Sequence, residues 1–324
     1  MKATLTTLLG AAVVLLGSLT TIHAGGKGSG GGGGGGGKGG GGGDDGGGLG
    51  DDTTTPRIAI QAPVVTNPRS GKTSLEVVAL EPDGSTATQL TDNAASASWP
   101  AWSKSYEYLS YCSGGWIYVQ EVKTGNRFAV TPAKTGGHDW WSDDGGFVYT
   151  GTEAMGYGIW FVSVDPATGA VGEPVLLREG QCLEPQVSPD GTQIAYWCVG
   201  GQIMVLDWQA GVETEFAGNP GYSPKWNADG SKILFSGTVC YLEEDGSIVC
   251  HREIVISDPD GTNRVPVTAL RDRAYYPMFS PDGTEVAFHS SVSGSWALYM
   301  TTIGSGSMTL LHENAEPWGG DWAP

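Results

Sequence analysis

From residue 56 onward the chain repeats one pattern of hydrophobic and polar positions: a large hydrophobic residue, a short polar turn and an apolar triplet. The hydrophobic residue that opens each copy is called the anchor. Successive anchors lie 39, 46, 39, 53 and 43 residues apart. A repeat of this length with strand-like content is typical of a propeller blade. The anchors are Trp102, Trp141, Val187, Trp226 and Phe279, and a half copy ends the chain at Trp322-Ala323-Pro324.

Each copy predicts four strands. In most copies an Asp-Gly pair separates the anchor from the triplet, and this favours a hairpin because glycine supplies the positive φ of the turn. A second hairpin follows, so that one copy makes one four-stranded antiparallel blade. The triplets are Leu109–Tyr111, Phe147–Tyr149, Ile194–Tyr196, Ile233–Phe235 and Val286–Phe288. The second turns are Glu121–Gly125, Asp165–Gly169, Asp207–Gly211, Asp258–Gly261 and Gly304–Gly306.

The first repeat begins one strand out of phase. Ile58–Ile60 has the form of the triplet, Leu75–Leu80 that of a third strand and Thr88–Thr91 that of a fourth. We expect Trp318–Pro324, at the other end of the chain, to supply the missing first strand. The predicted fold is an all-β, six-bladed β-propeller with four-stranded antiparallel blades, whose last blade is closed by the N- and C-terminal strands. Such closure hides sheet edges that would otherwise promote aggregation.

The repeat resembles that of TolB-type propellers. Pro277–Phe288 reads Pro-x-Phe-Ser-Pro-Asp-Gly-x-x-Val-Ala-Phe, Pro185–Tyr196 is a second clear copy, and Pro224–Phe235 is a weaker one. The resemblance covers residues 56–324 and implies the propeller fold. Propellers with this repeat occur in TolB, in dipeptidyl-peptidase-type enzymes and in oligogalacturonate lyases, so the resemblance does not fix one activity.

Two segments of different composition precede the repeats. Met1–Ala24 combines Lys2, an apolar run and a small-residue end, which is typical of a cleaved secretory signal; a membrane anchor is the alternative, but the apolar run is short and interrupted. Residues 25–50 contain 20 glycines in 26 positions and are expected to form flexible coil, either a tether or a tail without a partner. We therefore predict a signal peptide at 1–24, a Gly-rich linker at 25–55, a propeller at 56–324 and a periplasmic or secreted location.

The propeller region is strongly acidic, with 33 Asp and Glu against 14 Lys and Arg from residue 51 onward. This balance disfavours nucleic acid, whose phosphates require basic residues, and anionic membrane surfaces. We expect a monomer without membrane insertion after signal cleavage.

Five cysteines in an exported chain favour disulfides. Cys240 and Cys250 flank an insertion with a turn at Asp245-Gly246, so they should lie opposite each other and pair. Cys182 and Cys198 are symmetric about the turn at Asp190 and form a possible second pair. Cys112 is left over, and buried free thiols are the alternative for it and another cysteine.

No motif predicts catalysis. The chain lacks the Gly-x-Ser-x-Gly elbow. Its histidines after the signal (His138, His251, His289 and His312) lack metal-ligand spacing. The aspartates of the Asp-Gly turns are better explained by hydrogen bonds to their own backbone than by calcium. No catalytic residue, metal or cofactor is predicted.

The candidate binding residues lie on connections that lead from one blade into the next. Aromatic side chains such as Trp99, Trp140 and Tyr222 precede anchors there, among charged residues. This mixture suits a sugar or a peptide, although the aromatics could instead form the second face of buried strands. The predicted ligand-binding residues are His138, Asp139, Glu184, Arg271, Arg273, Tyr275, Tyr276, Glu316 and Trp318.

Two classes of function remain open. The first is an exported, non-enzymatic propeller that binds a protein or glycan partner through its loop-rich face. The alternative is a propeller enzyme, a lyase or hydrolase acting on polysaccharide, with its site at the channel mouth.

Overall fold

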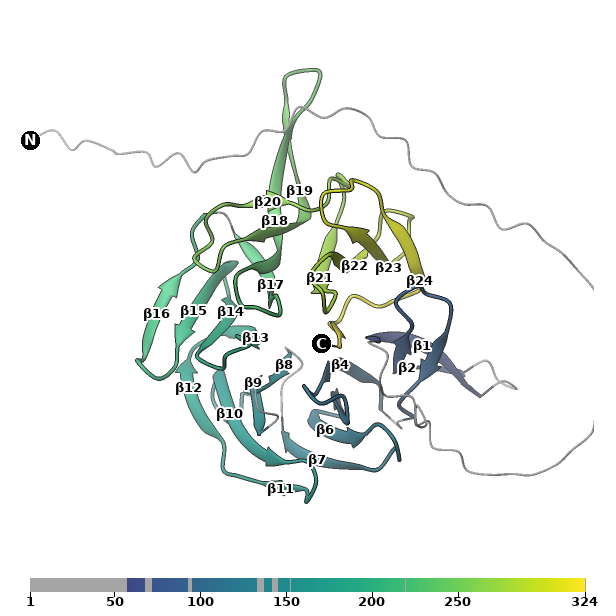
Figure 1. Cartoon of the computed structure of the whole chain (residues 1–324), viewed down its shortest axis with the longest axis vertical. Coiled ribbons are helices and arrows are strands. Elements are labelled where there is room, and N and C mark those ends of the chain that lie inside the picture. The colour runs from purple at the N-terminus through teal and green to yellow at the C-terminus, as the bar shows by residue number, and fades with distance from the viewer. Residues whose placement is uncertain are drawn as a thin grey trace, which may run out of the picture.

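The computed structural model describes residues 57–67, 72–92, 95–132, 137–141, 145–151, 153–218 and 220–323. The predicted signal peptide and linker lie outside this part of the chain. Six antiparallel sheets are arranged around a central axis, with the first strand of each sheet nearest the axis (Figure 1). The predicted six-bladed propeller is confirmed. Within the described ranges, no helix has the length and hydrophobicity needed to cross a membrane.

The blades are numbered I to VI in chain order of their inner strands. Blade I contains β4 (Ala97–Trp102), β5 (Tyr108–Ser113), β6 (Trp116–Glu121) and β7 (Arg127–Pro132). Blade II contains β8 (His138–Trp140), β9 (Gly146–Thr150), β10 (Gly158–Asp165) and an outer strand in two pieces, β11 (Ala170–Val171) and β12 (Val175–Glu179). Blade III contains β13 (Cys182–Val187), β14 (Gln193–Cys198), β15 (Gln202–Asp207) and β16 (Val212–Glu215).

Blade IV contains β17 (Gly221–Trp226), β18 (Ile233–Leu242), β19 (Ile248–Ser257) and β20 (Val265–Pro266). Blade V contains β21 (Ala274–Phe279), β22 (Glu285–Ser290), β23 (Ala297–Thr302) and β24 (Thr309–Glu313). Blade VI joins the two ends of the chain: β25 (Gly320–Trp322), β1 (Ile58–Asn67), β2 (Lys72–Leu80) and β3 (Ala87–Gln89). Ile58 pairs with Trp322 and Ile60 with Gly320, which confirms the predicted closure.

Blade II corrects the sequence prediction by one residue. In the other repeats the anchor pairs with the first residue of the triplet, and the residue that pairs with Phe147 is Trp140 rather than Trp141. Trp140 is fully buried, whereas Trp141 packs between blades against Phe161 and Trp208. Two consecutive tryptophans make the anchor ambiguous in the sequence, and only strand pairing decides between them. The turn predicted at 142–144 lies outside the described residues.

In each blade the residue three positions before the anchor has positive φ, and it lies in the inner strand or directly before it. In four blades the register shifts there, as in a β-bulge, and a proline follows, which has no N–H to leave unpaired. Positive φ is uncommon outside glycine and is often found at functional sites. A bulge also re-aims a side chain. The six residues are Trp99 (φ 55°), Gly137 (88°), Glu184 (54°), Ser223 (54°), Tyr276 (50°) and Gly319 (81°).

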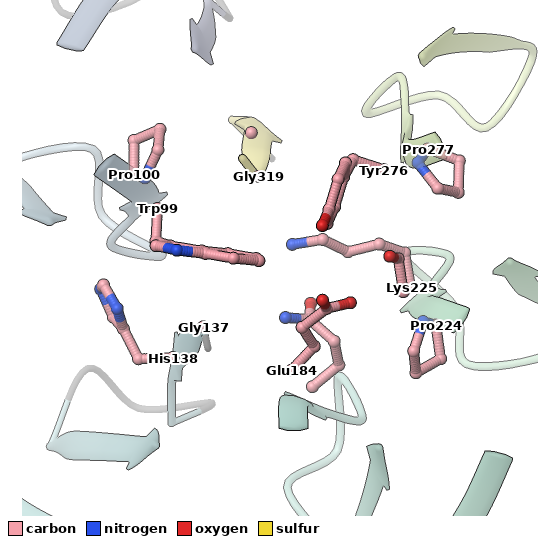
Figure 2. Close-up of a pocket in the computed structure, with 13 residues that line it drawn as sticks. Trp99, Pro100, Gly137, His138, Glu184, Pro224, Lys225, Tyr276, Pro277 and Gly319 are labelled. Atoms are coloured by element: carbon pink, nitrogen blue, oxygen red, sulfur yellow. The ribbon is translucent and has the colours of Figure 1, made fainter. Parts of the chain in front are cut away.

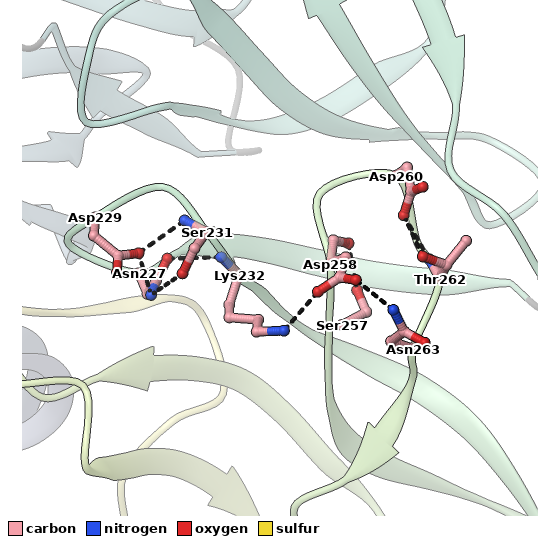
Figure 3. A network of polar contacts seen from close by, with 9 residues as sticks. All are labelled: Asn227, Asp229, Ser231, Lys232, Ser257, Asp258, Asp260, Thr262 and Asn263. Carbon is pink, nitrogen blue, oxygen red and sulfur yellow. Dashed lines mark hydrogen bonds and ion pairs between the residues drawn. The ribbon is translucent and has the colours of Figure 1, made fainter.

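The Asp-Gly turns are held by their own aspartates, as Figure 3 shows for blade IV. Asp229 Oδ1 accepts a hydrogen bond from Ser231 N at 2.8 Å, and Asp260 Oδ1 accepts one from Thr262 N at 2.9 Å. Lys232 Nζ lies 2.5 Å from Asp258 Oδ1 and so links the two turns. These contacts account for the recurrence of Asp at the turns.

Both predicted disulfides are present. Cys240–Cys250 joins directly opposite positions of β18 and β19, and Cys182–Cys198 joins β13 to β14. Cys112 is a buried free thiol. The long repeat spacing before Phe279 corresponds to the extended β18–β19 hairpin, which projects beyond the ring in Figure 1.

Candidate binding site

A pocket lies in the propeller channel where the inner strands of all six blades meet. We call it the channel pocket. Its volume is about 30 Å³, compared with the roughly 10–15 Å³ by the same measure that one water molecule requires. It therefore suits the tip of a ligand rather than a whole one. The lining residues are Trp99, Pro100, Gly137, His138, Glu184, Gln186, Ser223, Pro224, Lys225, Tyr276, Pro277, Gly319 and Gly320.

The positive-φ residues explain how the channel pocket forms. All six of them line it, one from each blade. Figure 2 shows the Trp99, Glu184, Lys225 and Tyr276 side chains converging on its centre. The repeated backbone shape thus gathers one position per blade on the axis, although these positions lie far apart in the sequence.

Glu184 is the unusual residue of the channel pocket. The residue is only 7% exposed, and its Oε2 atom has no hydrogen-bond partner in the described part of the chain. Burial raises the pKa of Glu184 to about 7, and the polar groups of Ser223 and Trp197 and the charge of Lys225 only partly oppose this. A buried oxygen without a partner carries a desolvation cost. It is therefore ready to accept a hydrogen bond from a ligand.

Lys225 supplies a donor to the same space. In the view of Figure 2 its side chain points toward the centre of the channel pocket, between the side chains of Trp99 and Tyr276. Nζ lies 3.4 Å from Asp321 Oδ1, which partly balances the charge. The channel pocket therefore presents both a hydrogen-bond acceptor and a donor.

Two aromatic rings form its apolar wall. Trp99 and Tyr276 meet edge to face with ring centroids 5.5 Å apart. Gly319 permits this arrangement, because a Cβ at that position would lie 2.7 Å from an atom of the Trp99 ring. Burial raises the pKa of Tyr276, so its hydroxyl stays protonated and can donate.

His138 belongs to a buried polar cluster at the edge of the channel pocket. Its Nε2 lies 2.8 Å from Ser110 Oγ, and its Nδ1 lies 3.6 Å from Cys112 Sγ. Burial lowers the pKa of His138 to about 3 and raises the pKa of the Cys112 thiol to about 12. The grouping has the composition of a nucleophile–base pair, but both pKa shifts oppose formation of the thiolate, which is the nucleophilic form of cysteine. We assign the cluster a structural role.

The predicted ligand residues fall into three groups. His138, Glu184 and Tyr276 line the channel pocket. Arg273 and Tyr275 line a second pocket, of about 390 Å³. Asp139, Arg271, Glu316 and Trp318 line neither of these pockets.

The four residues outside the pockets have other contacts. Asp139 Oδ2 accepts a hydrogen bond from Val187 N at 2.9 Å, and Arg271 is paired with Glu243 at 3.0 Å. The backbone nitrogen of Glu316 donates to Gln61 O at 3.0 Å. The backbone oxygen of Trp318 accepts a hydrogen bond from Trp99 N at 3.3 Å, and the residue is 49% exposed.

Several pocket residues were absent from the predicted ligand set, among them Trp99, Ser223 and Lys225. A sequence signal existed for the first two, because Trp99-Pro100 and Ser223-Pro224 place a residue before proline three positions before an anchor, as Glu184-Pro185 and Tyr276-Pro277 do. Lys225 has no such signal, since the equivalent position in the other blades carries unrelated residues. Among the residues the structure describes, no group of three or more His, Cys, Asp or Glu side chains is placed to hold a metal ion.

Comparison with known proteins identifies the fold. No protein-family model matches the chain. A TolB homolog of Chlorobium luteolum is 30% identical over 128 residues, which cover 38% of this chain and 27% of the relative. The chain thus matches about a quarter of the length of that curated relative.

Solved structures resemble the chain over a larger part of its length. TolB from Acinetobacter baumannii superposes with a TM-score of 0.65 at 22% identity, over 83% of this chain and 67% of that one. A protein of Agrobacterium tumefaciens described as TolB superposes with a TM-score of 0.58 at 18% identity, over 83% of this chain and 99% of that one. Hydrazine synthase of Kuenenia stuttgartiensis gives 0.50 at 12% identity, over 70% of each chain. The chain therefore has a TolB-like β-propeller fold.

Proposed function

We propose that the chain is an exported, non-enzymatic propeller that binds a polypeptide segment of another protein, with the tip of that segment in the channel pocket. The observation that carries this proposal is the buried Oε2 atom of Glu184, which has no hydrogen-bond partner among the described residues. A ligand that donates a hydrogen bond there removes a desolvation cost already present in the free protein.

The other pocket groups fit a peptide. A peptide group has one N–H donor and one C=O acceptor. Glu184 can accept a hydrogen bond from the peptide N–H. Lys225 Nζ, which points into the channel pocket (Figure 2), can donate one to the peptide C=O. The edge-to-face rings of Trp99 and Tyr276 offer an apolar surface to a neighbouring side chain.

The tip of the β18–β19 hairpin also favours a protein partner. Leu242, Ile248 and Val249 are 45%, 67% and 39% exposed, and Leu242 pairs directly with Ile248 across the hairpin. Adjacent apolar side chains on a projecting hairpin favour contact with another protein. We propose that they meet the partner outside the channel.

The compartment follows from the disulfides and the N-terminal pattern. Two disulfides in a chain of this kind favour an oxidising environment. The proposal places the chain in the periplasm or outside the cell, with residues 1–24 as its signal and residues 25–55 as a tether. As a flexible coil, its Gly-rich part at residues 25–50 would have a root-mean-square end-to-end distance on the order of 25–30 Å.

The test compares the partners retained by variants of the propeller. Wild-type protein and the variants Glu184→Gln and Trp99→Ala are immobilised and exposed to an envelope extract of the source organism. Glu179→Gln, an exposed change on the outer strand of blade II, is the matched control. We expect one protein to be retained by the wild type and the control and lost from both channel variants. Purified, that protein should protect channel-pocket amides from hydrogen exchange.

Other results would reject the proposal. A protein retained equally by the channel variants would place the interface elsewhere. Retention of a glycan alone would replace the polypeptide by a sugar ligand. Release of shortened polysaccharide during incubation would favour the lyase or hydrolase alternative.

A further inference from the structure

The second pocket lies at the base of the β18–β19 hairpin, outside the channel. Its volume is about 390 Å³, within the range of small-ligand sites. The hairpin contributes one side of the lining, and the connection into β21 contributes the other. The lining residues are Thr238, Cys250, His251, Arg252, Asp272, Arg273 and Tyr275.

Two of the lining residues of this pocket are arginines, Arg252 and Arg273. Neither Arg252 nor Arg273 forms an ion pair with a carboxylate of the described chain. Arg252 instead donates to Thr238 Oγ1 at 3.2 Å and lies over the Tyr222 ring at 4.5 Å. Nearby Arg271, by contrast, is paired with Glu243. In a chain with 35 acidic and 17 basic residues, two guanidinium groups without a carboxylate partner on one pocket are unusual.

The pocket is also well organised. Arg252 N donates to Asp272 O at 3.2 Å, and a short bridge joins Arg252 to Arg273. The Cys240–Cys250 disulfide fixes the hairpin next to these residues. Backbone contacts and a covalent link therefore fix the backbone that carries the two arginines before any ligand arrives, which lowers the entropy cost of binding.

The remaining groups indicate what the ligand carries besides negative charge. Asp272 is a carboxylate acceptor, while Thr238 and His251 can form further hydrogen bonds. Tyr275 provides a ring face and lies 5.9 Å from Trp296, centroid to centroid. Charged, hydroxyl-binding and aromatic groups on one pocket match a pyranose ring bearing a carboxylate.

We propose that this second pocket binds a sugar acid of the hexuronate class. Arg252 and Arg273 hold the carboxylate, Asp272 and Thr238 hold ring hydroxyls, and the sugar face lies on Tyr275. Planar guanidinium groups bind carboxylates through paired hydrogen bonds. An acidic peptide side chain fits less well, because it carries no hydroxyl groups for Asp272 and Thr238 to bind and the lining offers little apolar surface to its neighbours. The site is independent of the polypeptide proposed for the channel pocket.

The test uses purified propeller with its disulfides intact. Calorimetry and ligand-observed NMR measure D-glucuronate and D-galacturonate, with D-glucose and D-galactose as neutral counterparts and an acetylated aspartate-containing tripeptide as the acidic peptide. We expect a uronate to bind and its neutral counterpart to bind at least tenfold more weakly. Arg273→Ala should weaken uronate binding at least tenfold. Arg271→Ala removes the same charge from a nearby arginine that is already paired, and it should leave binding unchanged.

Several outcomes would overturn the proposal. They are equal binding of uronate and neutral sugar, binding unaffected by Arg273→Ala, absence of uronate binding, and tripeptide binding stronger than that of the uronates. Glu184→Gln separates the two proposed sites, because it should abolish partner capture in the channel while leaving uronate affinity unchanged.

Discussion

Asp321 Oδ2 accepts a hydrogen bond from the backbone nitrogen of Trp102 at 2.9 Å, joining two residues that are 219 positions apart. The bond runs from the inner strand of blade VI to the anchor of blade I. Asp139 makes the equivalent bond to Val187 N, from blade II to blade III, at the same distance. A carboxylate one residue before an anchor therefore links its blade to the next.

Replacing Asp321 with Ala should weaken ring closure. Trp102 N would lose its acceptor, and Lys225 Nζ, 3.4 Å from Asp321 Oδ1, would lose its ionic partner. Leaving such groups unpaired costs about 1–3 kcal/mol, measurable as a shift in the urea midpoint. Asp321→Asn keeps an oxygen acceptor and should lose less stability than Asp321→Ala. Equal stability of all three proteins would mean that the bond contributes nothing to closure.

Deleting residues 318–324 should destabilise the protein further than any single substitution. The deletion removes β25, which pairs with β1, and with it Trp322, which is 7% exposed. Burial of one large side chain alone contributes roughly 1.5–3 kcal/mol, so the total loss should be several kcal/mol. Thermal unfolding measures it. An unchanged melting temperature would show that blade VI does not depend on its C-terminal strand.

Peptide mapping of unreduced, exported protein should recover Cys240 linked to Cys250 and Cys182 linked to Cys198. Cys112 should react with thiol reagents only after unfolding, because it is buried. Replacing either pair with serines should cost roughly 2–4 kcal/mol. Alkylation of Cys240 and Cys250 in the native protein without reduction would contradict both the pairing and the oxidising compartment.

Glu184 should make stability fall as pH rises from about 4.5 to 7. Burial raises the pKa of Glu184 from 4.5 to about 7 in the folded protein. Between these values the folded state holds a proton that the unfolded state has lost, so its contribution declines by up to about 1.4 kcal/mol per pH unit. Glu184→Gln removes this slope, and its stability relative to the wild type should increase with pH. A pH-independent difference in urea-unfolding free energy would show that Glu184 titrates normally.

His289 should make stability fall as pH decreases from about 6.5 to 3, the opposite of the pH dependence expected from Glu184. Burial lowers the pKa of His289 from 6.5 to about 3. Between these values the unfolded chain binds a proton that the folded protein does not, so stability falls as pH decreases through this window. His289→Leu should flatten the acid limb of the stability curve, whatever its effect at pH 8. Acid titration followed by circular dichroism tests this, and an identical acid limb in the variant would refute it.

The sequence by itself determined the architecture, because a repeat of turn and strand signals leaves few ways to bury its apolar triplets. It also determined the closure and the Cys240–Cys250 pair, since both depend on local register: Trp322 is an anchor without a blade of its own, and Asp245-Gly246 centres the hairpin between the cysteines. Local patterns of this kind restrict the conformation and pairing of the neighbouring backbone. They can be read without knowing the rest of the molecule.

Only the tertiary structure decided which side chains meet. Trp140 and Trp141 are equivalent as local signals, and the pairing with Phe147 selects Trp140. Glu184 and Arg271 were equally suitable as ligand residues on the connections. Both residues have a φ of 54°, but Glu184 lines the channel pocket and its Oε2 has no hydrogen-bond partner among the described residues, whereas Arg271 is paired with Glu243. Lys225 enters the same pocket from blade IV without a motif of its own. The reason is that the ring brings together residues from six blades, and which of their side chains meet at the axis depends on side-chain directions and contacts between distant segments that no local pattern records.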